Sequence, residues 1–359
     1  MIPYYVTYLL IFLLNNISRS VYIDKRKRNS FFCISSFLVV CTLLSLRHQT
    51  MGVDLFGGFN NKESIGYLGA FDKINQYSWL DVFSMEGFLN YEKGYVIFNK
   101  LVGSIYENKQ FFLVVCAFIS TLPVILHIKS RSASPMMSVL IYLGLPVFLL
   151  SFSGLRQAIA IGITVFSVKY IEEKKLVKFI LVIFLSTLFH YSSITFIIAY
   201  PLYHLKISDN RRLLLTMFIP LVYVLKEPLF YVFSKIYKEN AEVGETGAFT
   251  LFLVFFLVYI FLVFFNKDDD KKQSGMINLF YLACICQAFG GIYQQAMRVG
   301  YYFMIHAVIA IPNTIDKMKD KRSAKLANIV IFTAFVGFGI YSLRNSTWAM
   351  TYPYKFFWD

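Results

Sequence analysis

The sequence predicts an all-α integral membrane protein, and two observations lead to this prediction. Of its 359 residues, 57% are hydrophobic and only 16% are charged, whereas soluble domains carry about 45–50% apolar and about 25% charged residues. The apolar residues also form long runs, and a helix that crosses a bilayer needs roughly 20 mostly apolar residues in succession. The polar stretches are too short for a soluble domain, so we predict a single polytopic membrane domain over residues 1–359.

Twelve stretches of the chain are apolar enough to be candidate transmembrane helices. The longest segment between them, residues 47–109, is mixed in charge, and its apolar part Tyr95–Tyr106 favours an interfacial or re-entrant helix. The eighth stretch is the weakest because Pro220 lies inside it. In chain order the stretches are 3–20, 30–46, 110–128, 135–152, 154–171, 175–190, 191–206, 212–227, 248–266, 276–293, 298–315 and 325–343.

The distribution of charge predicts the orientation, because cytoplasmic loops carry an excess of Lys and Arg. If the N-terminus is outside, 22 of the 35 Lys and Arg residues fall on the inner side, together with 9 of the 21 acidic residues. A wrong number of helices would scramble this asymmetry. We therefore predict about twelve spans, both termini on the outer side, and an extracytoplasmic loop at 47–109. The net charge of +14 has the same source, so nucleic acid is not an expected partner.

Several familiar kinds of site are missing from the sequence. The five cysteines lie in apolar runs and are expected to be inert packing residues. The acidic run Asp268–Asp270 is followed by two lysines, which favours a solvated turn over a metal site. Walker A, HExxH and GxSxG patterns do not occur. We therefore expect no metal and no organic cofactor, and we set aside ATP-driven transport and metal-dependent transfer from nucleotide sugars.

Arginines stand out at the predicted outer ends of the helices, where the positive-inside rule predicts few of them. Arg47 follows the second helix, Arg156 opens the fifth and Arg298 opens the eleventh. Guanidinium groups bind phosphate oxygens through paired hydrogen bonds, and a charge at membrane depth marks a candidate functional site. Together with Gln157, these residues are predicted to bind a pyrophosphate-linked lipid. The alternative for each arginine is a side chain that extends to lipid headgroups.

Two further residues on the same predicted side are candidate general bases. His190 ends the sixth predicted helix, and imidazole changes its protonation near neutral pH. The alternative is a structural histidine, hydrogen-bonded at a helix end. Asp54 follows the second helix and would either act as a base or pair with Arg47. The sequence leaves open which of His190 and Asp54, if either, is the base.

The stretches that hold these residues resemble the EpsG family of Wzy-like polysaccharide polymerases. The resemblance covers most of the chain and is strongest over residues 154–193, from Gly-Leu-Arg-Gln-Ala to Leu-Phe-His-Tyr-Ser-Ser. The Arg, Gly and Asp residues within 47–54, Arg298 before two tyrosines, and the terminal Tyr352-Pro-Tyr also fit. Each motif is short, but their order and spacing together are specific. His48 departs from the family pattern, so we assign it no role.

The resemblance implies a polymerase at the outer face of the bacterial cytoplasmic membrane. Such enzymes join oligosaccharide repeat units carried on undecaprenyl pyrophosphate into O-antigen, capsule or exopolysaccharide. It implies that the three arginines and Gln157 hold the pyrophosphate and stabilise it as the leaving group. His190 or Asp54 would deprotonate the acceptor hydroxyl. The expected partners are the lipid-linked glycan, the bilayer, and a chain-length regulator and a flippase of the same pathway.

Other functions remain open at this point. A flippase for lipid-linked oligosaccharides would also place arginines in a polar cavity, but transporters often contain internal repeats and none is visible here. An O-antigen ligase would share the gross features of a polymerase. A sugar O-acetyltransferase would need a histidine motif of its own and a route for an acyl donor. A non-catalytic subunit of a polysaccharide assembly complex is the last alternative.

Overall fold

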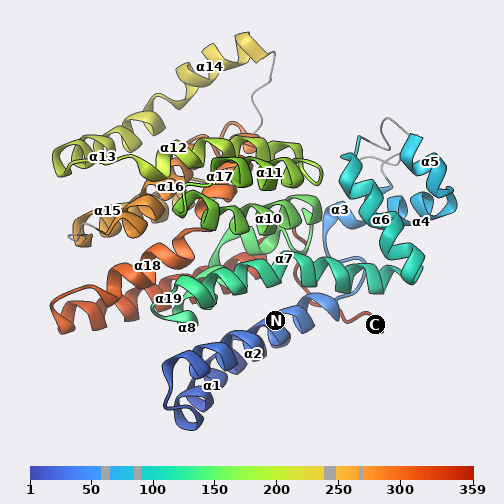
Figure 1. The fold of residues 1–359 in the computed structure, drawn as a ribbon, viewed down its shortest axis with the longest axis horizontal. Helices are drawn as coiled ribbons and strands as arrows, with labels where there is room; N and C mark the ends of the chain where they lie inside the picture. The colour runs from blue at the N-terminus through green and yellow to red at the C-terminus, as the bar shows by residue number, and fades with distance from the viewer. Residues whose placement is uncertain (58–64, 85–89, 238–247, 267–269) are drawn as a thin grey trace.

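The computed structural model describes residues 1–57, 65–84, 90–237, 248–266 and 270–359, and this part of the chain is helical with irregular connections (Figure 1). In chain order the helices are α1 (Ile2–Val21), α2 (Lys25–Ser45), α3 (Val53–Phe56), α4 (Gly66–Gln76), α5 (Trp79–Ser84), α6 (Lys93–Ile105), α7 (Lys109–Arg131), α8 (Pro135–Gly144), α9 (Pro146–Leu149), α10 (Leu155–Glu172), α11 (Leu176–Thr187), the 3₁₀ helix η1 (Tyr191–Ile198), α12 (Ala199–His204), α13 (Asp209–Val224), α14 (Lys226–Tyr237), α15 (Ala248–Phe265), α16 (Lys271–Ala288), α17 (Gln294–Met304), α18 (Ala307–Asp316) and α19 (Lys321–Asn345).

Every predicted transmembrane stretch contains helix, but three of them are broken near their middle. The stretch 135–152 divides into α8 and α9 because Leu145, which precedes Pro146, adopts an extended conformation, as the residue before a proline tends to do. The stretch 191–206 begins as η1 and continues as α12. The stretch 298–315 divides into α17 and α18 around His306.

Length and composition identify fewer spans than the twelve that the sequence predicts. Among the described residues, four helices are long and apolar enough to cross a membrane: α2, α7, α15 and α19. The bent pair of α13 and α14, with 72° between its halves, would make a fifth. The broken helices are individually too short, although irregular backbone at membrane depth is tolerated where protein buries it. The apolar helices define an integral membrane protein, and the number of twelve spans stays a prediction.

The long helices form a bundle with two distinct ends. Helix α10 packs against α7 and α11, α2 packs against α1 and α7, and α16 packs against α15 and α17. At the right of Figure 1, α2 and α11 end while α7 and α10 begin, and we call this the site end. At the left, α7 and α10 end while α2 and α16 begin, and we call this the basic end.

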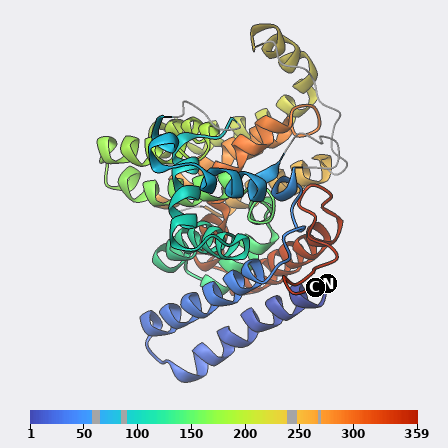
Figure 2. The same cartoon turned by 90° about the vertical axis from the view of Figure 1, so that its right-hand side faces the viewer.

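The two terminal segments meet toward the site end (Figure 2): the Tyr4 hydroxyl donates to the Thr351 carbonyl at 2.5 Å, and the Tyr4 ring centroid lies 5.5 Å from that of Tyr354. The C-terminal tail follows the end of α2: the backbone N–H of His48 donates to the Lys355 carbonyl at 2.8 Å, and that of Phe357 donates to the Leu46 carbonyl at 2.9 Å. The two termini are therefore on the same side of the bundle, as an even number of spans requires. The assignment of this side to the outside of the membrane stays a prediction.

The described part of the predicted loop 47–109 folds into α3, α4, α5 and α6, at the site end of the bundle. Helix α6 packs on α4, α5 and α7, and it coincides with the apolar segment expected to form a helix. The backbone N–H of Tyr95 in α6 donates to the Leu188 carbonyl at 3.0 Å. This contact holds the start of α6 against the turn that leads to His190.

Candidate functional site

A polar pocket of about 260 Å³ lies at the site end, between α3, α4 and the starts of α10 and α17. It brings together five residues that the sequence placed in a candidate site, although they come from four separate segments: Asp54, Arg156, Gln157, His190 and Arg298. The other lining residues are Val53, Gly57, Gly66, Tyr67, Tyr91, Leu150, Gly154 and Trp348.

Arg156 lies in the first turn of α10 and is held by an acid and two aromatic rings. Its Nη1 is 2.5 Å from Oε2 of Glu92. Its guanidinium carbon lies 4.6 Å from the ring centroid of Tyr91 and 5.8 Å from that of Tyr67. Cation–π contacts of this kind add to the ion pair. The Arg156 side chain is therefore fixed in position, and most of its charge is already compensated by Glu92.

Glu92 also contacts His190. One carboxylate oxygen, Oε1, is 3.3 Å from Nδ1 of His190 and accepts the backbone N–H of Tyr191 at 2.9 Å. Burial acts to raise the pKa of Glu92, but the hydrogen bonds from His190 and Tyr191, together with the charge of Arg156, lower it to about 2. Glu92 is therefore an anion at neutral pH and can only accept hydrogen bonds.

The position of Glu92 fixes the tautomer of His190. An anionic carboxylate beside Nδ1 requires that Nδ1 carries the hydrogen, which leaves Nε2 of the neutral ring as the proton acceptor. The same arrangement of a carboxylate behind a histidine orients the general base in serine hydrolases. His190 lines the pocket, whereas Glu92 stands behind it. Glu92 is therefore a positioning residue for His190.

Arg298 supplies the pocket with a cation that has no ion-pair contact among the described residues, and Asp54 is the acid that its charge influences. It lies in the first half of α17, and its carbonyl oxygen accepts a hydrogen bond from Nε2 of Gln157 at 2.7 Å. Its guanidinium forms no ion pair with any residue in the part of the chain that the structure describes. Gln157 therefore fixes the α17 backbone beside α10 and leaves the Arg298 side chain available for an anion.

Asp54 lies in the short helix α3 on the opposite wall of the pocket. Its backbone N–H donates to the Ser153 hydroxyl at 3.2 Å, which joins α3 to the segment before α10. Burial raises the pKa of Asp54, and the nearby charges of Arg298 and Arg156 oppose this shift without cancelling it. A carboxylate with a raised pKa is a better base than an ordinary one, so the structure keeps both Asp54 and His190 as candidates.

Arg47, the sixth residue predicted for the site, lies elsewhere. Its side chain is fully buried, with 0% exposed, and it does not line the pocket. The guanidinium donates to the Ser151 carbonyl and lies 5.1 Å from the ring centroid of Phe152. The backbone of Arg47 bridges to Phe356 in the C-terminal tail. The tail and the segment before α10 enclose this arginine, which therefore braces the backbone that leads to Arg156.

Sequence reasoning missed Glu92 and the two tyrosines that contact Arg156. All three lie in the segment 47–109, where no membrane span fixes the depth of a residue. The segment contains several acids, and no local pattern distinguishes Glu92 from the others. Only the packing of α6 against the turn before His190 brings Glu92 to the site.

In the described ranges, no group of three or more His, Cys, Asp and Glu residues is arranged to hold a metal ion. Asp268 and Asp269 of the acidic run lie outside the described residues, while Asp270 caps α16 and binds Lys317.

The fold and the pocket define a class: a polytopic helical membrane protein with an arginine- and tyrosine-lined polar pocket at one end of its bundle. Within this class the chain belongs to the EpsG family, whose family model matches residues 30–356. The match confirms the resemblance derived from the sequence and places the protein in polysaccharide biosynthesis. No curated protein and no solved structure matches the chain.

Proposed function

We propose that this protein is a polysaccharide polymerase that joins lipid-linked oligosaccharide repeat units at the outer face of a bacterial cytoplasmic membrane. The donor is a growing glycan on undecaprenyl pyrophosphate, and the acceptor is the next lipid-linked unit. The observation that carries the proposal is the convergence of Asp54, Arg156, Gln157, His190 and Arg298 on one pocket, in a chain of the EpsG family.

We assign to Arg298 the stabilisation of the pyrophosphate as it leaves. In the reaction the bond between the anomeric carbon and the pyrophosphate oxygen breaks, and the oxygen keeps the electron pair. A fixed cation stabilises the charge that develops on this oxygen. Arg298 forms no ion pair among the described residues, although its charge acts on Asp54, whereas Arg156 is paired directly with Glu92. Arg156 lies in the first turn of α10, and the free backbone N–H groups of this turn also favour binding of an anion.

We assign to His190 the role of the general base that removes the proton of the acceptor hydroxyl. As this hydroxyl oxygen bonds to the anomeric carbon, its proton passes to Nε2 of the imidazole. The resulting imidazolium is stabilised by the Glu92 carboxylate at Nδ1. The Asp54 carboxyl contacts the Ser153 hydroxyl, but no described carboxylate stands behind it to stabilise its protonated form, so we place it second as the base. Its carboxylate is in position to accept hydrogen bonds from sugar hydroxyls.

The size of the pocket agrees with a site for the reacting groups alone. Its volume of about 260 Å³ is just below the range of about 300–1,000 Å³ that is usual for small-molecule pockets. The pocket therefore has room for the pyrophosphate and part of an adjoining sugar. The rest of the glycan and the prenyl chain lie outside it. A chain-length regulator and a flippase are proposed partners that deliver units and limit the chain.

The flippase alternative is weaker because the described polar pocket opens at one end of the bundle only. A flippase must expose a headgroup site alternately to both faces. The large cavity at the basic end shares none of the pocket's lining residues. A ligase would use the same leaving-group chemistry, and it differs from a polymerase in its acceptor.

The proposal is tested by complementation of a strain that lacks the gene. Arg156→Ala, His190→Ala and Arg298→Ala are expected to abolish long glycan chains on a gel while single repeat units still reach the cell surface. Arg344→Ala is the matched control, because this exposed arginine at the end of α19 does not line the pocket. Protein abundance is measured for each variant.

Two outcomes would count against the polymerase. Long chains in all three pocket variants at normal abundance would show that the pocket is not the site of polymerisation. A failure of single repeat units to reach the surface would instead identify a flippase.

A further inference from the structure

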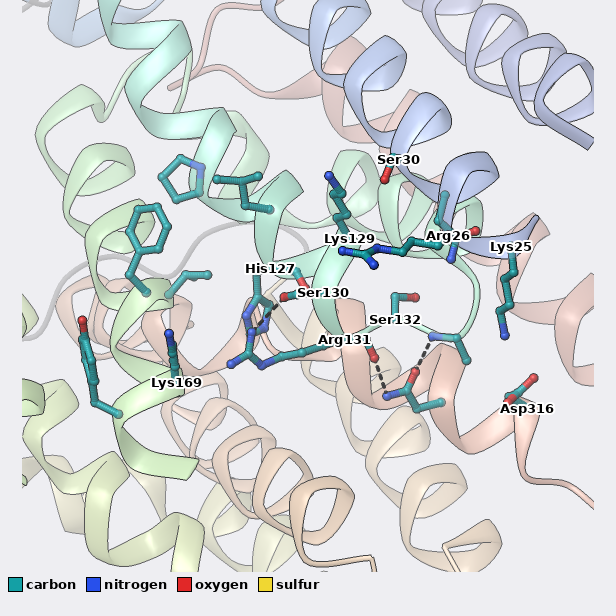
Figure 3. Close-up of a pocket in the computed structure, with 18 of the residues that line it drawn as sticks. Lys25, Arg26, Ser30, His127, Lys129, Ser130, Arg131, Ser132, Lys169 and Asp316 are labelled. Carbon is teal, nitrogen blue, oxygen red and sulfur yellow. Dashed lines mark hydrogen bonds between the residues drawn. The ribbon is translucent and has the colours of Figure 1, made fainter. Parts of the chain in front are cut away.

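The largest of the cavities described here lies at the basic end, far from the pocket. Its volume is about 1,330 Å³, and it opens between the start of α2 and the ends of α7, α10 and α18 (Figure 3). Arg156 and Lys169 mark the two sites on α10, and a rise of about 1.5 Å per residue separates them by roughly 20 Å. The cavity is therefore a separate site, which the proposed polymerase reaction does not use.

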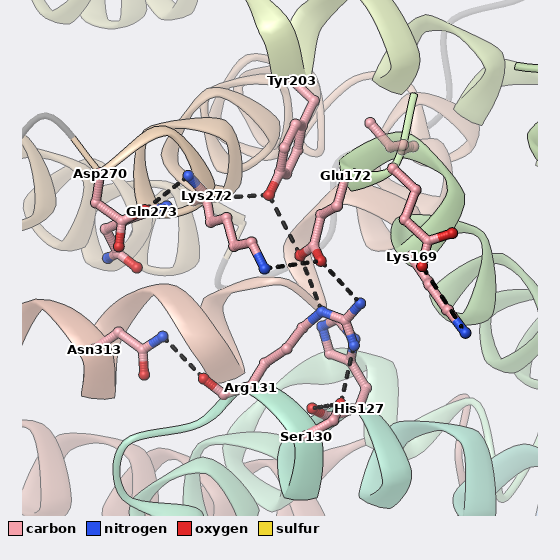
Figure 4. A network of polar contacts seen from close by, with 12 residues as sticks. His127, Ser130, Arg131, Lys169, Glu172, Tyr203, Asp270, Lys272, Gln273 and Asn313 are labelled. Atoms are coloured by element: carbon pink, nitrogen blue, oxygen red, sulfur yellow. Dashed lines mark hydrogen bonds and ion pairs between the residues drawn. The ribbon is translucent and has the colours of Figure 1, made fainter. Parts of the chain in front are cut away.

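Cations dominate the lining of this cavity. The lining contains one acid, Asp316, and six cations: Lys25, Arg26, Lys129, Arg131, Lys169 and Lys317. Two of the six are neutralised by neighbouring acids. Arg131 binds Glu172 through both carboxylate oxygens at 3.1 and 3.2 Å (Figure 4). Lys317 binds Asp270 at 2.6 Å.

The remaining cations lack comparable partners. Lys169 is 3.9 Å from Glu173 with its side chain 64% exposed, which makes a weak pair. Lys25, Arg26 and Lys129 form no ion pair with any described residue. In Figure 3, Arg26 of α2 extends toward Lys129 of α7. Like charges that face each other across a cavity repel, and an anion between them removes this repulsion.

A buried histidine in the same wall provides a second, independent indication of a ligand. His127 lines the cavity and is only 4% exposed, yet neither of its ring nitrogens has a hydrogen-bond partner among the described residues. Buried polar groups are nearly always hydrogen-bonded, and an unpaired one requires an explanation. Figure 3 places His127 beside Arg131, next to the cations. Its ring packs against that of His306, with 5.7 Å between the centroids, and the His306 nitrogens are unpaired among the described residues as well. A rotation of the His127 side chain toward the cavity would let a polar ligand group satisfy it.

Part of the cavity lining is apolar, which favours a lipid as the ligand. It is formed by residues of α7, α10 and α11, namely Pro123, Leu126, Val165, Phe166 and Val182. Leu126 and Phe166 are 40% and 47% exposed. A free phosphate would use only the cations, whereas an acyl chain would cover the apolar wall. Basic pockets between transmembrane helices bind anionic headgroups in this way.

We propose that the cavity at the basic end binds an anionic phospholipid, with its phosphate between Lys25, Arg26 and Lys129 and its acyl chains along the wall of Leu126 and Phe166. The volume exceeds the range of about 300–1,000 Å³ for ordinary small-molecule sites, which leaves room for a headgroup and the first part of its chains. This inference does not depend on the polymerase activity.

The test compares two double variants in the first turn of α2. Lys25→Gln with Arg26→Gln removes two cations that line the cavity, and Lys27→Gln with Arg28→Gln removes two from the same turn that do not. The full chain is delipidated in detergent and titrated with phosphatidylglycerol or phosphatidylcholine, and bound lipid is counted by native mass spectrometry. We expect wild type to prefer phosphatidylglycerol, the first variant to bind it roughly tenfold more weakly, and the second to change less than twofold.

A third variant tests the role of the histidine. His127→Leu removes both unpaired nitrogens, so it is expected to keep or raise the thermal midpoint while it weakens phosphatidylglycerol binding. A purely structural histidine would change stability without changing lipid preference.

Three outcomes would overturn the proposal. Equal losses in the two double variants would show that binding reflects surface charge in general. Equal binding of the two lipids by wild type would show that the cavity does not select an anion. Displacement of bound phosphatidylglycerol by equimolar inorganic phosphate or pyrophosphate would identify a soluble anion as the ligand.

Discussion

Glu92 holds two residues of the pocket with one carboxylate, Arg156 through Oε2 and His190 through Oε1. The change Glu92→Gln keeps the shape but removes the charge, and its amide can present an N–H to His190, which favours the wrong tautomer. We expect the polymerisation rate to fall by about 10²-fold or more, since a positioned general base contributes about 10²–10⁴. The measurement is initial rate against acceptor concentration.

The separate effects of Glu92→Gln on kcat and on KM distinguish a positioning role from a binding role. A positioning role for Glu92 predicts a lower kcat with little change in KM for the acceptor. A variant with normal kcat and a raised KM would contradict this role. Asp54→Asn is the comparison, because a group that only binds sugar hydroxyls changes KM first.

The same carboxylate makes stability depend on pH. The pKa of Glu92 is lowered from its ordinary value of 4.5 to about 2, so its contribution is fully present above pH 4.5 and is lost as the pH falls toward 2. We expect the thermal midpoint of wild type to exceed that of Glu92→Gln at neutral pH and the difference to shrink between pH 4.5 and 2. A difference that stayed constant over this window would show that Glu92 is not held as an anion.

At the scale of elements, the contact between α6 and the turn before His190 positions Glu92. Gly94 lies in the first turn of α6, and a Cβ there would be 2.6 Å from the Cβ of Leu188 and 2.7 Å from its carbonyl oxygen. Gly94→Ala must therefore push α6 away and separate Glu92 from His190. Because displacements of about 1 Å cost about 10²-fold in rate, we expect a loss of activity close to that of Glu92→Gln.

The matched control is Gly337→Ala in α19. A Cβ at Gly337 meets no atom within 4 Å, and alanine favours a helix over glycine by about 1 kcal/mol. This variant is expected to keep full activity and an unchanged or higher thermal midpoint. Full activity in Gly94→Ala at normal abundance would show that the α6 contact does not position the pocket.

The sequence predicted the residues that line the pocket better than the residues that hold them in position. Arg156 and Arg298 were predicted because cations at the predicted outer ends of apolar helices are scarce, and His190 because imidazole changes its protonation near neutral pH. The fold brings all three to one pocket. Glu92 and Arg47 depend on tertiary contacts that have no local pattern. Glu92 is placed by α6, and Arg47 is turned into the protein by the C-terminal tail. The breaks around Leu145 and His306 were missed because hydropathy measures how apolar a stretch is and not whether its helix continues.

At the scale of the whole molecule, the two ends of the bundle predict the orientation in the membrane. The site end carries both termini (Figure 2), and the basic end carries the cations of the large cavity. The positive-inside rule predicts that the basic end lies in the cytoplasm. The pocket would then face outward, as the proposed joining of lipid-linked repeat units requires.

Single cysteines test this orientation. With the five native cysteines replaced, Glu107→Cys at the site end is expected to react with a membrane-impermeant maleimide in intact spheroplasts. Lys319→Cys, between α18 and α19 at the basic end, is expected to react only after permeabilisation. Both side chains are exposed. The reverse pattern would place the pocket in the cytoplasm and exclude the proposed outer-face reaction.

The central claim is that the pocket joins lipid-linked repeat units with Arg298 at the leaving group. The most direct test is reconstitution of the purified protein in liposomes with undecaprenyl-pyrophosphate-linked repeat units from a strain that lacks it, followed by measurement of glycan length. We predict a ladder of polymers with wild type and with Arg344→Gln, and only single units with Arg298→Gln. An unchanged ladder with Arg298→Gln, or no polymer with wild type, would contradict the claim.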